Sequence, residues 1–432
     1  MNGLKMYIGA ALAVVMLPNA AHAGPRIDAI AEDYVRLVLE YGTHEDGYVD
    51  AYYGPERVRI QAEENPRGLR ALARETERLR LATLGLAWPS DRMEQKRRRF
   101  MVAQLSAVAT RIAMTRGATF TFSEEAGALF GVTPDIPTLD SFQPLLDRVE
   151  ALVPGDPETD GPLWQRVDAL KARYHIPAKA RARVMEAAIA RCKAATEPHI
   201  DLPDGERFDL EFVTGKPWSG YNWYKGNAHS LIQINTDLPI SIDRAVDLGC
   251  HEGYPGHHTL NALLEQRLVR ERGWAEFAVY PLYSPQSLIA EGTANAGIDV
   301  AFPGEARTAY EAEVLYPLAG LDPATAETLT ELNTALRALY PAQYSVADAY
   351  LSGRMTKADA ITALQETQLN SPERAAQRLD FIDTYRSYIV NYDIGRNMVD
   401  AYLDRHGTDV RARWAAFETL ISEPTLPDDL EK

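Results

Sequence analysis

The chain has 432 residues, of which 46% are hydrophobic and 25% charged, ordinary values for one large globular domain or two. Its formal net charge of −16 disfavours nucleic acids and anionic membranes as partners, because both are bound through basic surfaces. We therefore expect no nucleic-acid partner, and we expect no stable membrane insertion because no stretch after the N-terminal segment is long and apolar enough to be a membrane helix.

Residues 1–23 have the pattern of a signal peptide. Lys5 supplies a short basic segment, residues 6–17 form an apolar core, and Ala21-His22-Ala23 fits a cleavage site. Because the apolar run is too short to span a bilayer comfortably, we expect cleavage near Ala23 and a mature protein that is periplasmic or secreted. An uncleaved N-terminal anchor is the alternative.

Residues 24–200 are predicted to form an N-terminal helical region. Between Ile27 and Tyr41 the apolar residues recur at helical spacing. Ser123, followed by two glutamates, marks the start of a short helix. The other helices expected in this region cover residues 26–42, 68–86, 90–116, 141–152, 162–174 and 178–196.

Residues 201–432 are predicted to combine a small antiparallel β-sheet with further helices, so that the whole chain is mainly α with a small sheet, an α+β fold. Alternating polarity from Phe208 to Phe212 indicates a half-buried strand, and Gly226-Asn227 marks a turn. We expect the two regions to pack as one compact unit. The expected strands cover 208–212, 218–224 and 231–235, and the expected helices cover 241–272, a segment starting at Ser284, 371–406 and 408–421.

The segment Cys250-His-Glu-Gly-Tyr-Pro-Gly-His-His258 carries the chemistry of the second region. Neutral imidazoles are the commonest zinc ligands, and a neighbouring glutamate can act as a general base. The usual metallopeptidase spacing, His-Glu-x-x-His, places both imidazoles on one helical face. Here His251 and His257 are six positions apart, which on an ideal helix rotates the second side chain by roughly 240° from the first.

The Pro-Gly pair inside this segment offers a way to restore the register. Pro255 removes a backbone hydrogen bond and Gly256 tolerates unusual dihedral angles, so we predict a kink or bulge. A two-residue bulge would return His257 to the face of His251. His258 returns to that face without a bulge but lies about 10 Å further along the axis, and we rank it second as a ligand.

Glu291 is the candidate third ligand. The helix that starts at Ser284-Pro285 carries it among apolar and small residues. A carboxylate in such a setting is costly to bury unless it is paired or binds a metal. One turn further on, Asn295 could orient a ligand by a hydrogen bond, with Asp299 as the alternative.

The motif segment and Ala-Glu-Gly at 290–292 together resemble the bacterial family catalogued as domain of unknown function 885, which is grouped with the gluzincin metallopeptidases. The likeness extends to residues 50–55, 122–132 and 392–396, and so covers most of the chain after residue 25. It implies a gluzincin-like architecture with a helical cleft, in which an edge strand binds the extended substrate.

The same resemblance implies a Zn2+ cofactor held by His251, His257 and Glu291, with Glu252 as the general base. One segment departs from the family pattern. After the third ligand the family usually has Gly-Trp-Ala and another acid seven positions on, whereas this chain has Gly-Thr-Ala, with isoleucine at that position and Asp299 just beyond it.

The predicted helix over 371–406 carries a polar-aromatic stripe. One interpretation is a packing face whose hydroxyls are hydrogen-bonded. The other is a wall of the cleft, where Tyr392, which matches the family's Tyr-x-x-Gly element, would stabilise an oxyanion and Arg396 would hold a substrate carboxylate. The stripe comprises Tyr385, Tyr388, Tyr392 and Arg396.

The two cysteines, Cys192 and Cys250, are too few for a disulfide framework, although an exported chain permits a disulfide. Cys250 adjoins His251, but adjacent helical residues point in different directions. We therefore expect a small buried side chain at Cys250 rather than a zinc ligand.

These patterns lead us to expect an exported zinc-dependent hydrolase, a peptidase that cleaves short peptides or another small amide through a metal-activated water. Two other classes stay open. One is a zinc hydrolase of a non-peptide amide or ester. The other is a non-catalytic binding protein that retains or lacks the metal.

Overall fold

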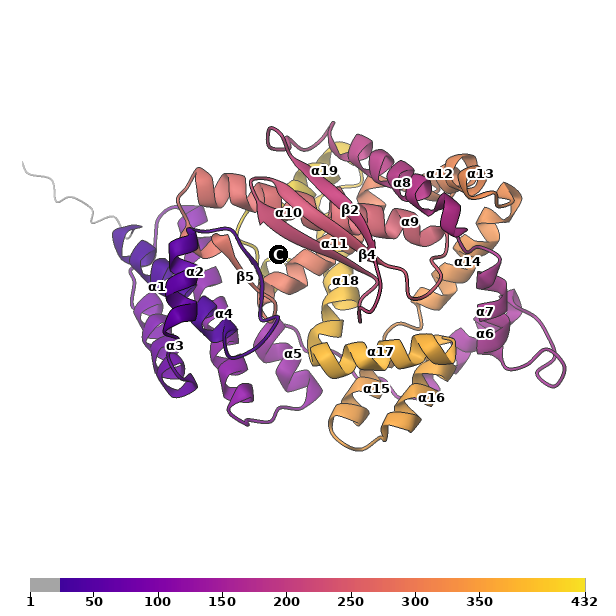
Figure 1. Cartoon of the computed structure of the whole chain (residues 1–432), viewed down its shortest axis with the longest axis horizontal. Coiled ribbons are helices and arrows are strands. Elements are labelled where there is room, and N and C mark those ends of the chain that lie inside the picture. The colour runs from indigo at the N-terminus through magenta and orange to yellow at the C-terminus, as the bar shows by residue number, and fades with distance from the viewer. Residues whose placement is uncertain (1–23, 432) are drawn as a thin grey trace, which may run out of the picture.

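The structure is a computed structural model that describes residues 24–431. The expected signal peptide, residues 1–23, lies outside the described residues. The prediction of a mainly α chain with a small sheet is confirmed (Figure 1). Within the described part of the chain, no helix is both long enough and apolar enough to cross a membrane.

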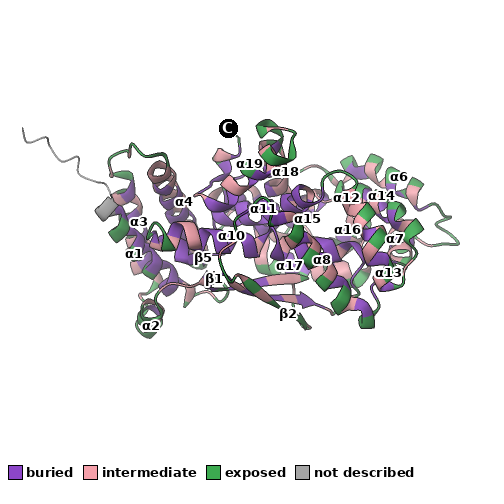
Figure 2. Ribbon diagram, turned by 90° about the horizontal axis from the view of Figure 1, so that it is seen from above, coloured by how far each residue is buried: buried purple, intermediate pink, exposed green. Residues whose placement is uncertain are grey.

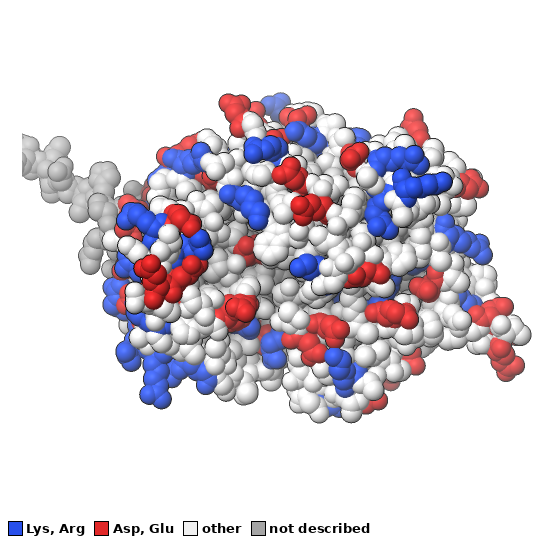
Figure 3. Space-filling model, viewed as in Figure 1, with Lys and Arg blue, Asp and Glu red and all other residues white. Residues whose placement is uncertain are grey.

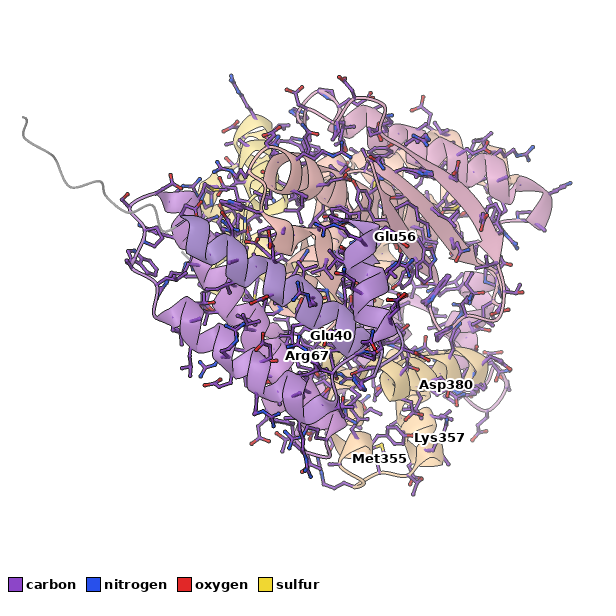
Figure 4. The ribbon with its side chains drawn as sticks, turned by 60° about the vertical axis from the view of Figure 1, so that its left-hand side comes forward. Glu40, Glu56, Arg67, Met355, Lys357 and Asp380 are labelled. Carbon is purple, nitrogen blue, oxygen red and sulfur yellow. A yellow bond between two sulfur atoms is a disulfide. The ribbon has the colours of Figure 1, made fainter. Side chains whose placement is uncertain are left out.

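Helices at the N-terminal end pack side by side at the left of Figure 1. The short helix expected at Ser123 is capped instead by Thr121, which forms a capping box with Glu124. The elements of this part are α1 (Gly24–Gly42), β1 (Val49–Tyr52), α2 (Glu56–Glu64), α3 (Leu69–Leu84), α4 (Arg92–Thr115) and α5 (Phe122–Phe130). Glu40 and Arg67 point toward one another in Figure 4, with Nε of Arg67 2.6 Å from Oε2 of Glu40. This ion pair holds the loop between α2 and α3 against α1.

The remaining helices surround the sheet and extend to the right of Figure 1. Lys357 and Asp380 face each other in Figure 4 at 3.0 Å, joining two of these helices at their outer surface. The helices outside the motif segment are α6 (Gln143–Leu152), α7 (Leu163–Ala172), α8 (Arg181–Thr196), α11 (Pro285–Ala301), α12 (Ala306–Tyr310), α13 (Tyr316–Ala319), α14 (Ala326–Arg337), α15 (Ala342–Leu351), α16 (Lys357–Gln368), α17 (Pro372–Tyr385), α18 (Val390–His406) and α19 (Val410–Ser422).

The three predicted strands form one sheet of order β2-β4-β3, with β2 at Arg207–Val213, β3 at Gly220–Gly226 and β4 at His229–Asn235. β3 and β4 form the expected antiparallel hairpin. β3 lies on the far side of β4, so β2 pairs with β4 instead of β3 and runs parallel to it. The sequence did not predict this parallel pairing. β1 pairs antiparallel with β5 (Val279–Pro281) in a separate two-stranded sheet.

Two segments that were each predicted as one helix are divided, the first at the kink or bulge expected at Pro255-Gly256 and the second at a place that was not expected. The expected helix over 241–272 is α9 (Asp243–Leu248), a π-helical turn and then α10 (His257–Leu264). The expected helix over 371–406 is α17 and α18, separated by a turn at Arg386, whose φ is 53°. Glu125 of α5 is fully buried and accepts hydrogen bonds from Arg386 Nε at 2.8 Å and Ser387 Oγ at 2.7 Å, which holds this turn in place.

Helix α11 runs through the centre of the molecule and is buried along almost its whole length (Figure 2). It crosses α18 closely at Gly292 and Gly395, where neither residue has a side chain. A Cβ at Gly292 would lie 2.6 Å from the backbone of Gly395, so only glycine permits this approach. The hydrophobic clusters on its two sides each combine residues from the 24–200 region with residues from the 201–432 region. This central position brings α11 between the motif segment and α18.

Candidate metal centre

His251, His257 and Glu291 converge on one point. Nε2 of His251 lies 3.2 Å and Nε2 of His257 lies 3.6 Å from Oε2 of Glu291. One nitrogen or oxygen atom from each of the three residues lies within 4.8 Å of the others. The predicted ligands are therefore brought together from two elements that are far apart in the sequence.

A two-residue bulge restores the register of the two histidines. The backbone N–H of Gly256 donates to the carbonyl of Cys250, six residues back instead of the usual four, at 3.0 Å. The regular ladder resumes with Leu260 N–H donating to Gly256. Only glycine fits at position 256, since a Cβ there would overlap the carbonyl oxygen of His251.

Hydrogen bonds around the three residues set which atoms face inward. Asn295 Nδ2 donates to the carbonyl of Tyr392 at 3.1 Å, so its Oδ1 accepts from Nδ1 of His251, also at 3.1 Å. A proton on Nδ1 leaves Nε2 with a lone pair that points at the centre. Of the two candidates for orienting a ligand, Asn295 occupies that position, whereas Asp299 pairs with Arg396.

The side chain of Glu291 is 5% exposed, and only one of its two carboxylate oxygens accepts a hydrogen bond from a described residue. The hydroxyl of Tyr388 donates to Oε1 at 2.8 Å, while Oε2 is buried without a hydrogen-bond partner among the described residues. Burial alone would raise its pKa, but the two imidazoles hold the pKa of Glu291 well below its usual range. An ionised, unsatisfied oxygen facing two imidazole nitrogens is a donor set that suits zinc.

Glu252 lies beside this centre and is 4% exposed. Its carboxylate receives no hydrogen bond from the described side chains, and Gly220 of β3 is so close that a Cβ there would lie 2.8 Å from Oε1. Burial raises the pKa of Glu252 to about 7. A carboxyl group of this pKa can both accept and return a proton near neutral pH.

The aromatic stripe divides between two roles. Tyr388 donates a hydrogen bond to Glu291, a contact that was not predicted from the sequence. The ring of Tyr392 stacks near that of His251, with centroids 6.5 Å apart, and its hydroxyl has no hydrogen bond within the described chain. Tyr392, the predicted oxyanion residue, therefore lines the cavity with a free donor. Arg396 also lines the cavity, but it already pairs with Asp299 and with Asp400.

His258, the second-ranked ligand, points away from the centre. Its Nε2 donates to Glu206 Oε2 at 2.8 Å, so its Nδ1 accepts from Ser230 Oγ, also at 2.8 Å. It is fully buried. The structure thus places His257, and not His258, beside His251.

Cys250 is buried, as expected, and it forms a disulfide with Cys192 of α8, a bond that the sequence permitted but did not predict. The bond fixes the residue before His251 to a neighbouring helix. Two cysteines allow only this pairing within the chain, but with 58 positions between them the sequence could not show that they meet.

Asp50 of β1 and Tyr221 of β3 also line the cavity and hydrogen-bond to each other. Burial raises the pKa of Asp50 to about 6. In the sequence, Asp50 stands at the start of the segment 50–55 that resembles the family, and no role was predicted for it. That likeness, far from the motif in the sequence, was the signal that could have pointed to the site.

These residues open onto a cavity of about 540 Å³. Its walls come from β3, the motif segment, α11, α14, α17 and α18. β3 is an edge strand of its sheet, and its residues Gly220–Asn222 line the cavity. The space is large enough for a small ligand.

No protein-family model matches the chain, and no curated protein matches it. Among solved structures, a candidate lipoprotein from Colwellia psychrerythraea is similar, with a TM-score of 0.51 and 15% sequence identity. The match covers 83% of this chain and 65% of that chain. At this identity the likeness concerns the fold alone.

Proposed function

We propose that the chain is an exported zinc-dependent hydrolase that cleaves short peptides. The observation that carries the proposal is the convergence of His251, His257 and Glu291 around a buried oxygen that has no hydrogen-bond partner. Three protein ligands leave a position open, as in catalytic rather than structural zinc sites. Export is supported by the signal-peptide pattern and by the description of the structural neighbour as a candidate lipoprotein.

A bound zinc ion would supply Lewis acidity, which polarises a scissile carbonyl and makes water a better nucleophile. Glu252 takes the proton of the attacking water and returns it to the leaving amine, a task that its raised pKa suits. The free hydroxyl of Tyr392 donates to the oxyanion as the carbonyl carbon becomes tetrahedral.

The edge of β3 positions the substrate in this proposal. β3 is an edge strand and its residues Gly220–Asn222 line the cavity, so in this proposal an extended peptide adds there as a further strand. The absence of a side chain at Gly220 lets that backbone approach Glu252 closely. A non-peptide amide or ester would gain nothing from such an edge, so we favour a peptide substrate.

Glu252→Gln tests the proposal. The variant should bind as much zinc as the wild type and lose turnover of a broad peptide library by at least about 100-fold, because a general base contributes that much. Zinc content and cleavage are measured on the same samples, with Glu211→Gln on the outer strand β2 as the matched control. Cleavage at the wild-type rate by Glu252→Gln would contradict the assignment, and a wild type that binds zinc without hydrolysing any peptide would favour the binding protein.

A further inference from the structure

One end of the cavity carries three basic side chains that the chemistry above does not use. Lys171 of α7, Arg244 of α9 and Arg374 of α17, here called the basic cluster, come from three separate helices. All three line the main cavity and also an adjoining recess of about 120 Å³. They therefore surround the space where the two hollows meet.

The protein itself neutralises the basic cluster poorly. Lys171 has no ion pair or side-chain hydrogen bond with any described residue. Among the described residues, the guanidinium of Arg374 donates only to the carbonyl of Pro239, at 2.7 Å. Arg244 forms an ion pair with Asp247 at 3.0 Å, but the same carboxylate also forms an ion pair with Arg307 at 2.8 Å.

The three cations also repel one another. Burial, followed by Arg374 and Arg244, lowers the pKa of Lys171. Burial, followed by Arg244, lowers the pKa of Arg374. Asp168 and Asp243 lie nearby and partly offset this charge without forming an ion pair with it. Partly buried cations in this arrangement are stabilised by an anion that enters the cavity.

The lining of the adjoining recess holds these three cations and one carboxylate, that of Asp168, unlike the rest of the molecule. The chain has a net charge of −16, and its outer surface in Figure 3 mixes acidic and basic side chains. A positive recess within an acidic protein attracts anionic groups to one place and disfavours them elsewhere.

The motif segment and β3 connect the basic cluster to Glu252. Arg244, Leu248 and Glu252 follow one another at intervals of four residues, and eight residues of helix rise ~12 Å. Arg244 Nη2 donates to Ser219 Oγ at 3.4 Å, directly before the part of β3 that approaches Glu252. An extended peptide advances ~3.3 Å per residue, so the two sites are separated by roughly three to four substrate residues.

We propose that the basic cluster binds a carboxylate of the substrate, three to four residues from the bond that is cleaved. The substrates are then short anionic peptides, recognised through the C-terminal carboxylate or through an acidic side chain. The role in substrate selection rests on the proposed function above, but the binding itself does not.

Calorimetry on the Glu252→Gln protein measures this binding without turnover. The probes are N-acetyl-penta-alanine as the free acid, the same peptide as the C-terminal amide, and an amide whose last residue is glutamate. We expect the acid to bind about 10 to 100 times more tightly than the amide, as for a hydrogen-bonded charge. Tight binding of the glutamate amide would assign the cluster to acidic side chains, and weak binding would assign it to the C-terminus.

Arg374→Gln and Lys171→Gln, each added to Glu252→Gln, should abolish the preference for the acid. Arg70→Gln, which removes an exposed arginine of α3 outside the cavity, should keep it. Circular dichroism confirms that each variant is folded. The proposal would be overturned if neither the free acid nor the glutamate amide bound more tightly than the alanine amide, or if both cluster variants kept the preference undiminished. Failure of the proposed function is separate: the preference would persist while the wild type cleaves no peptide.

Discussion

At the scale of single residues, Asn295 fixes the orientation of His251. Its amide bridges Nδ1 of the imidazole and the carbonyl of Tyr392. Asn295→Ala should weaken zinc binding about 10- to 100-fold, because the ring loses the partner that keeps Nε2 pointing at the centre. Competition with a chelator measures this change. Asn333→Ala, an asparagine elsewhere in the cavity lining, should leave the zinc affinity as it is, and equal affinities in all three proteins would contradict the role.

Also at this scale, the hydroxyls of Tyr388 and Tyr392 can be separated experimentally. Tyr388→Phe removes the hydrogen bond to Glu291 and should weaken zinc binding. Tyr392→Phe removes a hydroxyl with no partner in the described chain and should lower kcat by about 100-fold while zinc affinity is kept. Zinc affinity and kcat, measured on both variants, check this. The reverse pattern, with zinc lost in Tyr392→Phe, would contradict the assignments.

At the scale of elements, the disulfide between Cys192 and Cys250 joins α8 to the motif segment. It closes a long loop, so replacing both cysteines by alanine should lower the free energy of unfolding by about 4 kcal/mol. Urea denaturation of the double variant, beside wild type with and without a reductant, measures this cost. A double variant as stable as the oxidised wild type would show that the bond contributes no stability.

The helices were predictable because their apolar spacing and start signals are local: the helix expected from residue 371 does begin there, with Ser371 as the cap of α17. The two histidine candidates were predictable because Pro255-Gly256 marks the bulge within the motif itself, and Glu291 was predictable because it is an acid among apolar and small residues. The turn at Arg386 was not, because it depends on Glu125, which lies 261 positions away. The parallel pairing of β2 and the contact between Asp50 and Tyr221 likewise depend on partners that local patterns do not identify.

At the scale of the whole molecule, Glu206 makes stability depend on pH. Burial alone would raise its pKa, but hydrogen bonds from His258, Lys193 and Tyr254 lower it from 4.5 to about 2. A lowered pKa means that this carboxylate stabilises the fold above pH 4.5 and that the contribution is lost as the pH falls toward 2. Glu206→Gln should lower the free energy of unfolding at pH 6 by about 1–3 kcal/mol, with a shallower decline in acid. Parallel pH profiles for both proteins would contradict this.

The zinc content of the whole protein is the most direct test of the proposed metal centre. Elemental analysis of the mature protein, after incubation with zinc and removal of the excess, should give about one zinc ion per chain. His251→Ala should lose it, and His229→Ala, which changes a histidine of β4 paired with Asp209, should keep it. No zinc in the wild type, or equal zinc in wild type and His251→Ala, would mean that His251, His257 and Glu291 do not form a metal site.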